Sequence, residues 1–362
     1  MNTFDEMQTS GHEEVVFWRD RESGLRAIVS IHDTTLGPGL GGTRFYPYPS
    51  EREALCDVLR LSRAMTYKNA AAGLDFGGGK AVIIGDPARD RSEALLRSYG
   101  RLVETLGGRY ITTTDVGTTT ADLNVIARET RFVTGTDPAF GGSGDTSILT
   151  GVTVYLGMRA AAKVAWGSPS LAGRTVAVQG AGKVGRHLMQ HLRDEGARLI
   201  VADVNEAQTA TAATEFGARV VATDEIFDVE CDVFSPNALG AALNARTIPR
   251  LRCRIVCGGA NNQLETDEAA ARLERAGILY APDFIVNSGG VINVAEETRG
   301  YNAERARAHA ETVFETTLRV FATAKREGIT TEAAAERFAE ERIRTMQGVH
   351  RPLAPGRSPI PR

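Results

Sequence analysis

Two lysines and one aspartate are the first candidates for acid–base chemistry in this chain of 362 residues. Lys68 lies in a segment of helical apolar spacing, and Lys80 follows three glycines at the start of an apolar strand. Two ammonium groups in one cleft lower each other's proton affinity, so one can bind a carboxylate while the other acts as a base. Asp115, at the end of a predicted strand, can relay a proton. The same three residues also fit two solvated lysines and a helix-capping aspartate.

Histidine, the usual proton carrier near neutral pH, offers no better candidate. The chain has six histidines, and His187 and His191 are four residues apart on a predicted helix. Zinc can use that spacing, but no further ligand stands nearby, and we interpret the pair as part of a solvated helix face. No metal is predicted.

A glycine-rich turn predicts nucleotide binding. Gly180, Gly182 and Gly185 follow the apolar strand TVAVQ and open a helix. These glycines provide a tight turn, close approach to a pyrophosphate and close packing of helix on strand. Asp203, at the end of the next strand, can accept a hydrogen bond from a ribose 2′-hydroxyl and would repel a 2′-phosphate. The pattern therefore predicts a Rossmann domain that binds NAD rather than NADP.

The order of predicted elements indicates an α/β protein of two domains. In the first third, strands and helices alternate at residues 15–18, 25–32, 53–72, 81–84, 91–106 and 110–114. After Pro169, short strands alternate with helices, which predicts a parallel sheet with helices on both faces. These strands are expected at 175–179, 198–202, near 219, and at 232–235, 254–257 and 278–282.

We expect a mixed α/β catalytic domain over 1–140 plus 331–362 and a doubly wound Rossmann domain over 147–330, with the substrate cleft between them. The C-terminal helices, over about 311–346, would return to the first domain. A proline-rich end at 351–362 is predicted to be disordered.

Composition excludes several classes of protein. The 42 Lys and Arg nearly balance the 45 Asp and Glu, leaving a formal net charge of −3, so a nucleic-acid partner is not expected. No apolar run approaches the roughly 18 to 20 residues that span a bilayer, and the start lacks a signal-peptide pattern. The four cysteines are too few for a disulfide framework and are interpreted as structural thiols. A cytoplasmic protein is expected.

Six motifs together resemble the glutamate/leucine/phenylalanine/valine dehydrogenases over roughly residues 13–345. Within that family, WGSPSL and GILYAPD resemble the valine dehydrogenases of actinobacteria, although leucine dehydrogenases share most of the motifs. The six are LGPGLGGTRF (36–45), the 68–80 block, TTTDVGT (112–118), the glycine turn with Asp203, GGANNQL (258–264) and YAPDFIVNSGGVI (280–292).

The resemblance implies a role for each catalytic candidate. Lys68 would bind the substrate α-carboxylate, Lys80 would be the base that activates water, and Asp115 would carry the proton to and from the amino nitrogen. The substrate site would also include Gly41, Gly42 and Asn262. The cofactor-binding residues would be Ser147, Thr150, Gly180, Gly182, Lys183, Val184, Gly185, Asp203, Ala238, Asn261 and Asn287.

Substrate preference follows from the same match of motifs. Glutamate dehydrogenases have a lysine and a serine where this chain has Leu40 and Val294, so a side-chain carboxylate would be buried without a partner. With Thr113 and Val291, these residues would form an apolar pocket for valine, leucine or isoleucine. Thr113 stands where the family often has alanine. Asn237 stands where it has cysteine, which leaves any side-chain role there open.

The sequence therefore predicts an NAD-dependent dehydrogenase that deaminates branched-chain L-amino acids, with L-valine as the first choice, and that forms a homo-oligomer. Leucine dehydrogenase of the same family is the alternative. A catalytically silent NAD-binding regulator is a further alternative, which the presence of all three candidate catalytic residues makes less favoured.

Overall fold

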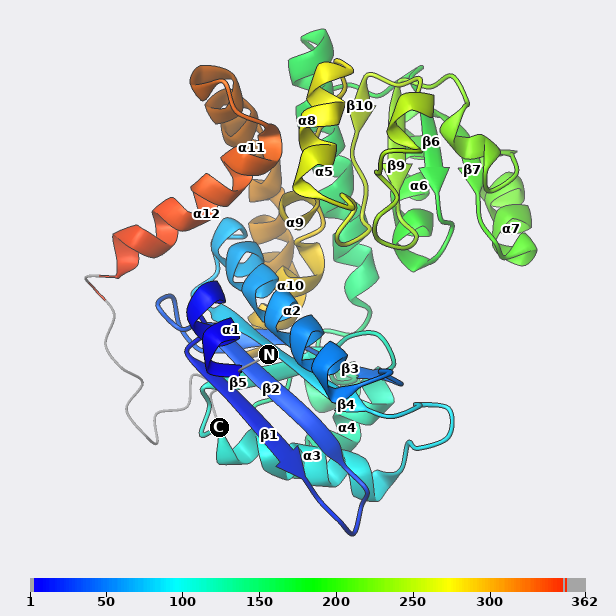
Figure 1. The fold of residues 1–362 in the computed structure, drawn as a ribbon. Coiled ribbons are helices and arrows are strands. Elements are labelled where there is room, and N and C mark those ends of the chain that lie inside the picture. The colour runs from blue at the N-terminus through cyan, green and yellow to red at the C-terminus, as the bar shows by residue number, and fades with distance from the viewer. Residues whose placement is uncertain (1–2, 348, 350–362) are drawn as a thin grey trace. The chain divides into compact units, whose positions relative to one another are not determined.

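The computed structural model describes residues 3–347 and 349, which fall into two compact units. Unit 1 comprises Met1–Thr146, Val291–Ala306 and Ala339–Arg362, and unit 2 comprises Ser147–Gly290 and Arg307–Phe338 (Figure 1). The predicted disordered end at 351–362 lies outside the described residues.

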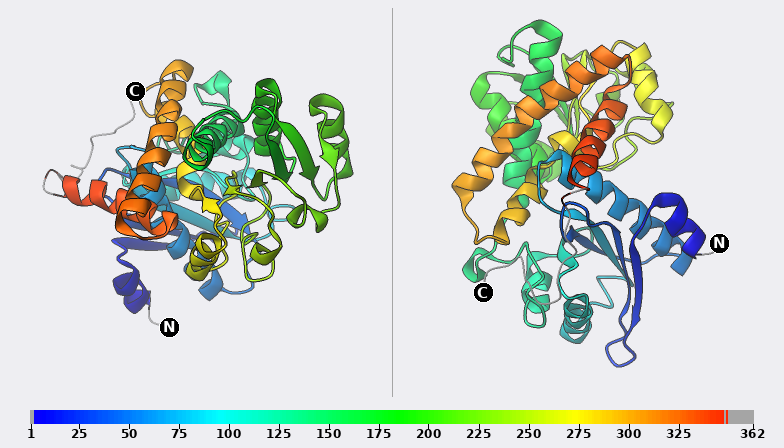
Figure 2. Two further views of the ribbon diagram at one scale, coloured as in Figure 1. Left: turned by 90° about the horizontal axis from the view of Figure 1, so that it is seen from above. Right: turned by 90° about the vertical axis from the view of Figure 1, so that its left-hand side faces the viewer.

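Unit 1 is built on a five-stranded mixed sheet of order β1-β2-β4-β3-β5. β1 and β2 form an antiparallel hairpin, β2 pairs antiparallel with β4, and β4, β3 and β5 run parallel. Helix α2 packs against β2, β3 and β4, and α3 and α4 pack against β5 (Figure 2). The elements are α1 (Thr3–Ser10), β1 (Glu14–Arg19), β2 (Arg26–Asp33), β3 (Gly39–Tyr46), α2 (Glu51–Ala71), β4 (Gly77–Ile84), α3 (Glu93–Thr105), β5 (Tyr110–Thr114), α4 (Thr120–Ile126) and η1 (Pro138–Phe140).

Glycines lie inside strands β3 and β4, at positions where the sequence analysis predicted no strand. β3 was not predicted, and β4 begins at Gly77, before the predicted start of its strand. A Cβ on Gly78 would overlap Thr66 Oγ1 of α2, and one on Gly79 would lie 2.5 Å from Tyr110 Cδ2. Side chains at these positions would therefore push α2 and β5 away from β4.

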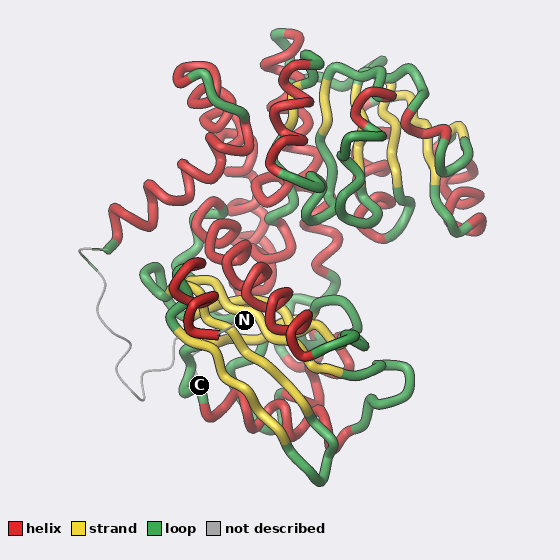
Figure 3. The backbone as a smooth tube through the Cα atoms, in the orientation of Figure 1, coloured by secondary structure: helices red, strands yellow, loops and turns green. Residues whose placement is uncertain are grey.

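Unit 2 contains a six-stranded, wholly parallel sheet of order β11-β10-β9-β6-β7-β8, flanked by helices (Figure 3), which confirms the predicted doubly wound fold. Its elements are α5 (Thr146–Trp166), β6 (Thr175–Gln179), α6 (Lys183–Glu195), β7 (Arg198–Ala202), α7 (Glu206–Phe216), β8 (Arg219–Val220), η2 (Glu225–Phe227), β9 (Val233–Pro236), η3 (Ile248–Arg250), β10 (Ile255–Val256), α8 (Asp267–Arg275), β11 (Leu279–Tyr280) and α9 (Asp283–Val286). Three helices, α10 (Gly289–Glu297), α11 (Ala303–Glu327) and α12 (Thr331–Met346), each contribute residues to both units.

Helix α5 is long and apolar, although the sequence analysis found no apolar run of membrane-spanning length. By length and composition alone it could cross a membrane, yet 56% of its most apolar stretch is buried. A Cβ on Gly157 would overlap Val286, and one on Gly151 would lie 2.7 Å from His187 Cβ. Such close packing on α9 and α6 identifies α5 as a core helix of unit 2.

The prediction that His187 and His191 lie on a solvated helix face is wrong, because α6 packs closely against α5. Both side chains are half-buried on α6, and the His191 ring stacks on Tyr155 of α5 with centroids 5.3 Å apart. Burial lowers the pKa of His191, helped by the nearby positive charge of Arg307. The pair is therefore part of the packing between two helices.

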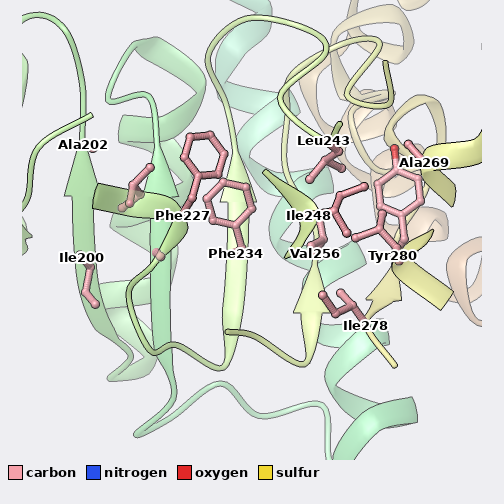
Figure 4. Close-up of a cluster of buried hydrophobic side chains, with 13 residues drawn as sticks. Ile200, Ala202, Phe227, Phe234, Leu243, Ile248, Val256, Ala269, Ile278 and Tyr280 are labelled. Carbon is pink, nitrogen blue, oxygen red and sulfur yellow. The ribbon is translucent and has the colours of Figure 1, made fainter. Parts of the chain in front are cut away.

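Aromatic and aliphatic side chains fill the space beside β9 and β10 (Figure 4). Phe234 is fully buried, and its ring lies 5.5 Å from that of Phe227, centroid to centroid. The cluster comprises Ala177, Ile200, Ala202, Ile226, Phe227, Phe234, Leu243, Ile248, Val256, Ala269, Leu273, Ile278 and Tyr280.

Replacing Phe234 with alanine should lower the free energy of unfolding of unit 2 by about 3 to 5 kcal/mol, because the cavity cannot close fully. Urea unfolding followed by the fluorescence of Trp166 in a Trp18→Phe background measures this. Leu239→Ala, at a side chain that is 85% exposed, is the control and should change stability by less than about 0.5 kcal/mol. Equal effects of the two substitutions would contradict the assignment of this core.

Candidate active site and nucleotide site

Lys80 and Asp115 form a buried ion pair in unit 1. Lys80 lies in β4 with 7% of its side chain exposed, Asp115 directly follows β5 with 18% exposed, and Nζ lies 3.2 Å from Oδ2. Lys80 is therefore not a solvated lysine. Asp115 does not cap a helix either, because Thr119 is the N-cap of α4.

Arg44 is a second cation on Asp115, and the sequence analysis missed it. From β3, its Nε donates to Asp115 Oδ2 at 2.9 Å, and its Nη1 donates to Asp57 Oδ2 at 2.8 Å. Asp57, on α2, also accepts from Tyr48 at 2.6 Å. A signal was available, because a charged residue in the glycine-rich 36–45 motif needs a partner once that segment is buried.

Opposing effects set the charge of Asp115. Burial by itself would raise the pKa of this carboxyl, but the positive charges of Lys80 and Arg44 outweigh burial and hold the pKa below its ordinary value. Asp115 is therefore ionised at neutral pH. Its backbone is also fixed, since Asp115 N donates to Thr118 Oγ1 at 2.9 Å.

Two glycines of β3 make room for this ion pair. A Cβ on Gly42 would lie 2.8 Å from Asp115 Cβ, and one on Gly41 would overlap the carbonyl oxygen of Gly79. Any side chain at either position would displace Asp115 or β4. These are the glycines predicted to line the substrate site.

Lys68 lies in the last turn of α2 and is half-buried. Its neighbour Asn69 is buried and donates from Nδ2 to the carbonyl oxygens of Leu40, at 3.1 Å, and Gly77, at 2.6 Å. This contact fixes the end of α2 to β3 and β4, the strands that carry Arg44 and Lys80.

The four residues predicted to form an apolar pocket are all buried in unit 1. Leu40 and Thr113 lie on the paired strands β3 and β5, and Val291 and Val294 lie on α10. Thr113 is 8% exposed, and its Oγ1 has no hydrogen-bond partner within the described residues. A Cβ on Gly135 would lie 2.7 Å from that Oγ1, so Thr113 packs directly on the Gly135 backbone.

Glu297, at the end of α10, connects this helix to the same segment. Its carboxylate accepts from Gly135 N at 2.9 Å and from Ser143 N at 2.8 Å. Burial raises the pKa of Glu297, although the backbone donors partly counter it. Thr113 and α10 therefore both meet the Gly135 segment.

In unit 2, the glycine turn lies at the point where the sheet reverses its winding. β7 and β9 flank β6 on opposite sides, which is where α/β sheets of this kind bind nucleotides. Gly180 follows β6 with φ of 98°, and a Cβ there would lie 2.8 Å from the carbonyl carbon of Asn237 and 2.9 Å from Ala238 N. Only glycine fits this position.

The remaining members of the turn also match the predicted roles. A Cβ on Gly182 would meet no atom within 4 Å, so the space above it is open to a ligand, and α6 begins at Lys183. A Cβ on Gly185 would overlap the Gly180 carbonyl. Asp203 directly follows β7, and its carboxylate accepts from Ala181 N at 2.6 Å and from Asn205 N at 2.8 Å.

Asn237 has a structural role that the sequence left open. Its Nδ2 donates to the Ser235 carbonyl at 2.9 Å, and its Oδ1 accepts from Gly259 N at 2.8 Å. Asn287, in the loop before α10, donates from Nδ2 to Oδ1 of Asn261, in the loop after β10, at 2.9 Å. These amides join the ends of β9 and β10 to the loop before α10.

The other predicted nucleotide-site residues lie around this edge of the sheet. Asn262, which was predicted for the substrate site, also lies in unit 2; it has a positive φ of 51°, and its carbonyl accepts from Ala241 N at 2.7 Å. A Cβ on Gly259 would lie 2.6 Å from Val184 Cγ1, so the start of α6 packs on the 258–264 loop. Ser147 and Thr150 are buried in the first turns of α5, and Lys183, Ala238 and Asn261 are exposed.

Comparison with known proteins shows the family of the chain. Residues 12–132 match the model of the Glu/Leu/Phe/Val dehydrogenase dimerisation domain, and 141–207 with 201–347 match that of the glutamate/leucine/phenylalanine/valine dehydrogenases. The leucine dehydrogenase of Geobacillus stearothermophilus is 54% identical, covering 98% of this chain and 96% of its own. The valine dehydrogenase of Streptomyces coelicolor is 53% identical, covering 95% of each.

The fold also resembles that of a solved structure. The L-tryptophan dehydrogenase from Nostoc punctiforme superposes with a TM-score of 0.84 at 43% identity, covering 95% of this chain and 99% of that one.

A buried lysine–aspartate pair in one unit and a Rossmann nucleotide site in the other define a nucleotide-dependent dehydrogenase. More narrowly, the chain belongs to the glutamate/leucine/phenylalanine/valine dehydrogenase family and is an amino-acid dehydrogenase, as the motifs predicted. The open cradle at Gly182 and the acidic Asp203 fit NAD, which is the cofactor of this family.

Asp203→Asn should weaken NADH binding by about tenfold or more, because a charged hydrogen-bond acceptor is lost. The same change should narrow the preference for NADH over NADPH, because the repulsion of a 2′-phosphate is removed. Titration calorimetry with both nucleotides measures the two effects. Glu206→Gln, an exposed acid on α7, is the matched control, and equal losses in both variants would contradict the role of Asp203.

Proposed function

We propose that this chain catalyses the NAD-dependent oxidative deamination of branched-chain L-amino acids, with L-valine as the preferred substrate. The observation that carries the proposal is the buried contact of 3.2 Å between Lys80 Nζ and Asp115 Oδ2. Such a contact allows a proton to pass between a lysine and a carboxylate, as deamination requires.

The roles proposed for the residues are those that the family resemblance implies, and the contact between Lys80 and Asp115 supports them for that pair. NAD, when bound, accepts the α-hydrogen of the amino acid as a hydride. Lys68 holds the α-carboxylate by charge, and Asp115 takes a proton from the amino nitrogen before hydride transfer. Lys80 then removes a proton from the water that adds to the imine carbon. Asp115 returns its proton to the amino nitrogen of the resulting carbinolamine. The C–N bond then breaks, the hydroxyl proton passes to the departing ammonia, and ammonium and a 2-oxo acid remain.

The surroundings support an apolar substrate side chain. Leu40, Val291 and Val294 are buried in the same unit as Lys80 and Asp115. A glutamate side chain beside Leu40 and Val294 would lose its hydration without gaining a cation, which costs several kcal/mol.

Thr113 favours valine over leucine. It is larger than the alanine common in the family, and its packing on Gly135 gives it little room to move aside. A smaller pocket penalises the extra methylene of leucine by about 1 to 3 kcal/mol. Leucine dehydrogenase is the second candidate, supported by the 54% identity to the Geobacillus stearothermophilus protein of that name.

The assembly and location form part of the proposal. The match of residues 12–132 to a dimerisation domain supports a homo-oligomer. All four cysteines are free thiols, which fits a reducing compartment, and we place the protein in the cytoplasm. A silent regulator is not favoured, because Lys68, Lys80 and Asp115 are all present.

Lys80→Ala should lower kcat for valine, leucine and isoleucine by about 100-fold to 10,000-fold, because the base is removed. NADH formation followed by absorbance tests it, and NADH binding to the variant should persist. Lys325→Ala, an exposed lysine of α11, is the control and should keep full activity. If the wild-type protein turns over no aliphatic amino acid, the proposed function is wrong.

Thr113→Ala should raise kcat/KM for leucine relative to valine by about tenfold, because two heavy atoms leave the pocket. Thr114→Ala is the matched control, since successive strand residues point to opposite faces. An unchanged ratio in Thr113→Ala would remove Thr113 from the pocket, and a wild-type preference for leucine would identify the second candidate.

A further inference from the structure

We infer that Arg44 is a positioning residue that holds Asp115 in place for proton transfer, with Asp57 fixing Arg44 from behind. This inference rests on the proposed function, in which Asp115 is the proton carrier. It assigns a task to a side chain that no motif analysis singled out.

The guanidinium of Arg44 bridges two carboxylates. Its Nε donates to Asp115 Oδ2 at 2.9 Å, and its Nη1 donates to Asp57 Oδ2 at 2.8 Å. Because the guanidinium is planar and rigid, two such contacts fix both its position and its tilt. A lysine at this place could offer only a point charge.

Asp57 is itself held firmly. Tyr48 donates to its Oδ2 at 2.6 Å and Arg60 donates to its Oδ1 at 2.9 Å. Burial would raise the pKa of Asp57, but these hydrogen bonds, with the charges of Arg44 and Arg60, lower it. Asp57 therefore remains an anion that anchors Arg44 to α2.

Strand β3 holds Asp115 by its backbone as well. Thr118 Oγ1 accepts from Asp115 N at 2.9 Å and donates to the Thr43 carbonyl at 2.8 Å. Thr43 is the residue before Arg44, so side chain and backbone of Asp115 are fixed by neighbouring residues. Lys80 Nζ and Arg44 Nε both contact Oδ2 of Asp115.

Arg44 supplies something that Lys80 cannot. A lysine that acts as a base must be neutral before it takes a proton, and in that state it offers no positive charge to the Asp115 anion. Arginine stays protonated at every working pH. The charged groups acting on Asp115 are Lys80 from β4 and Arg44 from β3, with Asp57 and Arg60 of α2 acting through Arg44. Arg44 is thus the constant part of the field around Asp115.

The test is the pH dependence of kcat/KM for the best amino-acid substrate. In Arg44→Gln, the acid limb should move up by about one pH unit, because Asp115 loses one of its two cations and its pKa rises. The value of kcat should fall about tenfold or more, and KM should change less. Arg52→Gln, which removes an exposed cation from the same helix α2 outside this network, is the control and should leave the acid limb in place.

Arg44→Lys separates charge from geometry. It should keep the acid limb near the wild-type position while kcat falls, because the charge is retained and the two-pronged contact is lost. If Arg44→Gln fails to fold by circular dichroism, this variant decides: a kcat equal to wild type overturns the inference. For a folded Arg44→Gln, an unmoved acid limb overturns it, as does an equal shift in Arg52→Gln.

A readout independent of turnover separates this inference from the proposed function. The Asp115 carboxyl of ¹³C-labelled protein, assigned with Asp115→Asn, can be titrated by NMR in wild type and Arg44→Gln. A higher pKa in the variant supports the role of Arg44 even if no amino acid is turned over. An unchanged pKa contradicts it even if deamination is observed.

Discussion

The structure of unit 1 depends on one buried carboxylate shared between two cations. Burying Asp115 alone would cost several kcal/mol, and Lys80 and Arg44 offset that cost only because three strands bring them within 3.2 Å and 2.9 Å of the same oxygen. The strands can pack so closely because glycines occupy the positions of β3 and β4 at which a side chain would overlap a neighbouring element. Sheet geometry and site electrostatics are therefore one constraint: a residue that widens the sheet also breaks the ion pairs.

The two units divide the chemistry between them. Proton transfer is assigned to Lys80 inside β4 and Asp115 just after β5 in unit 1, where charges are buried and fixed. The nucleotide is assigned to the winding reversal beside β6 in unit 2, where backbone and a single acid do the recognition. Substrate preference, by contrast, is assigned to Thr113 and its apolar neighbours. A family with this layout can change its substrate while leaving both proton chemistry and nucleotide binding intact.

The sequence predicted most of the fold because apolar runs and helical spacing mark these elements directly. All strands of unit 2 and the helices α2 and α3 were found from such patterns. β3 was missed, because GLGGTRFY shows no alternation and its three glycines indicate a loop. Lys80, Asp115 and the glycine turn stand in recognisable motifs. Arg44 also lies in a motif, at 36–45, but the motif assigns it no task, and Asp57 lies in none; the importance of both comes from a contact between segments that only the folded chain brings together.

The connectivity of the units has a consequence for how the protein is made. The chain passes from one unit to the other after residues 146, 290, 306 and 338, so each unit is assembled from separated stretches. On the ribosome, residues 1–146 emerge without α10, whose Glu297 binds Gly135 and Ser143, and must wait for the whole nucleotide-binding sheet to follow. Neither unit is complete until α12 has been synthesised. Completion of both units is therefore a late event in synthesis.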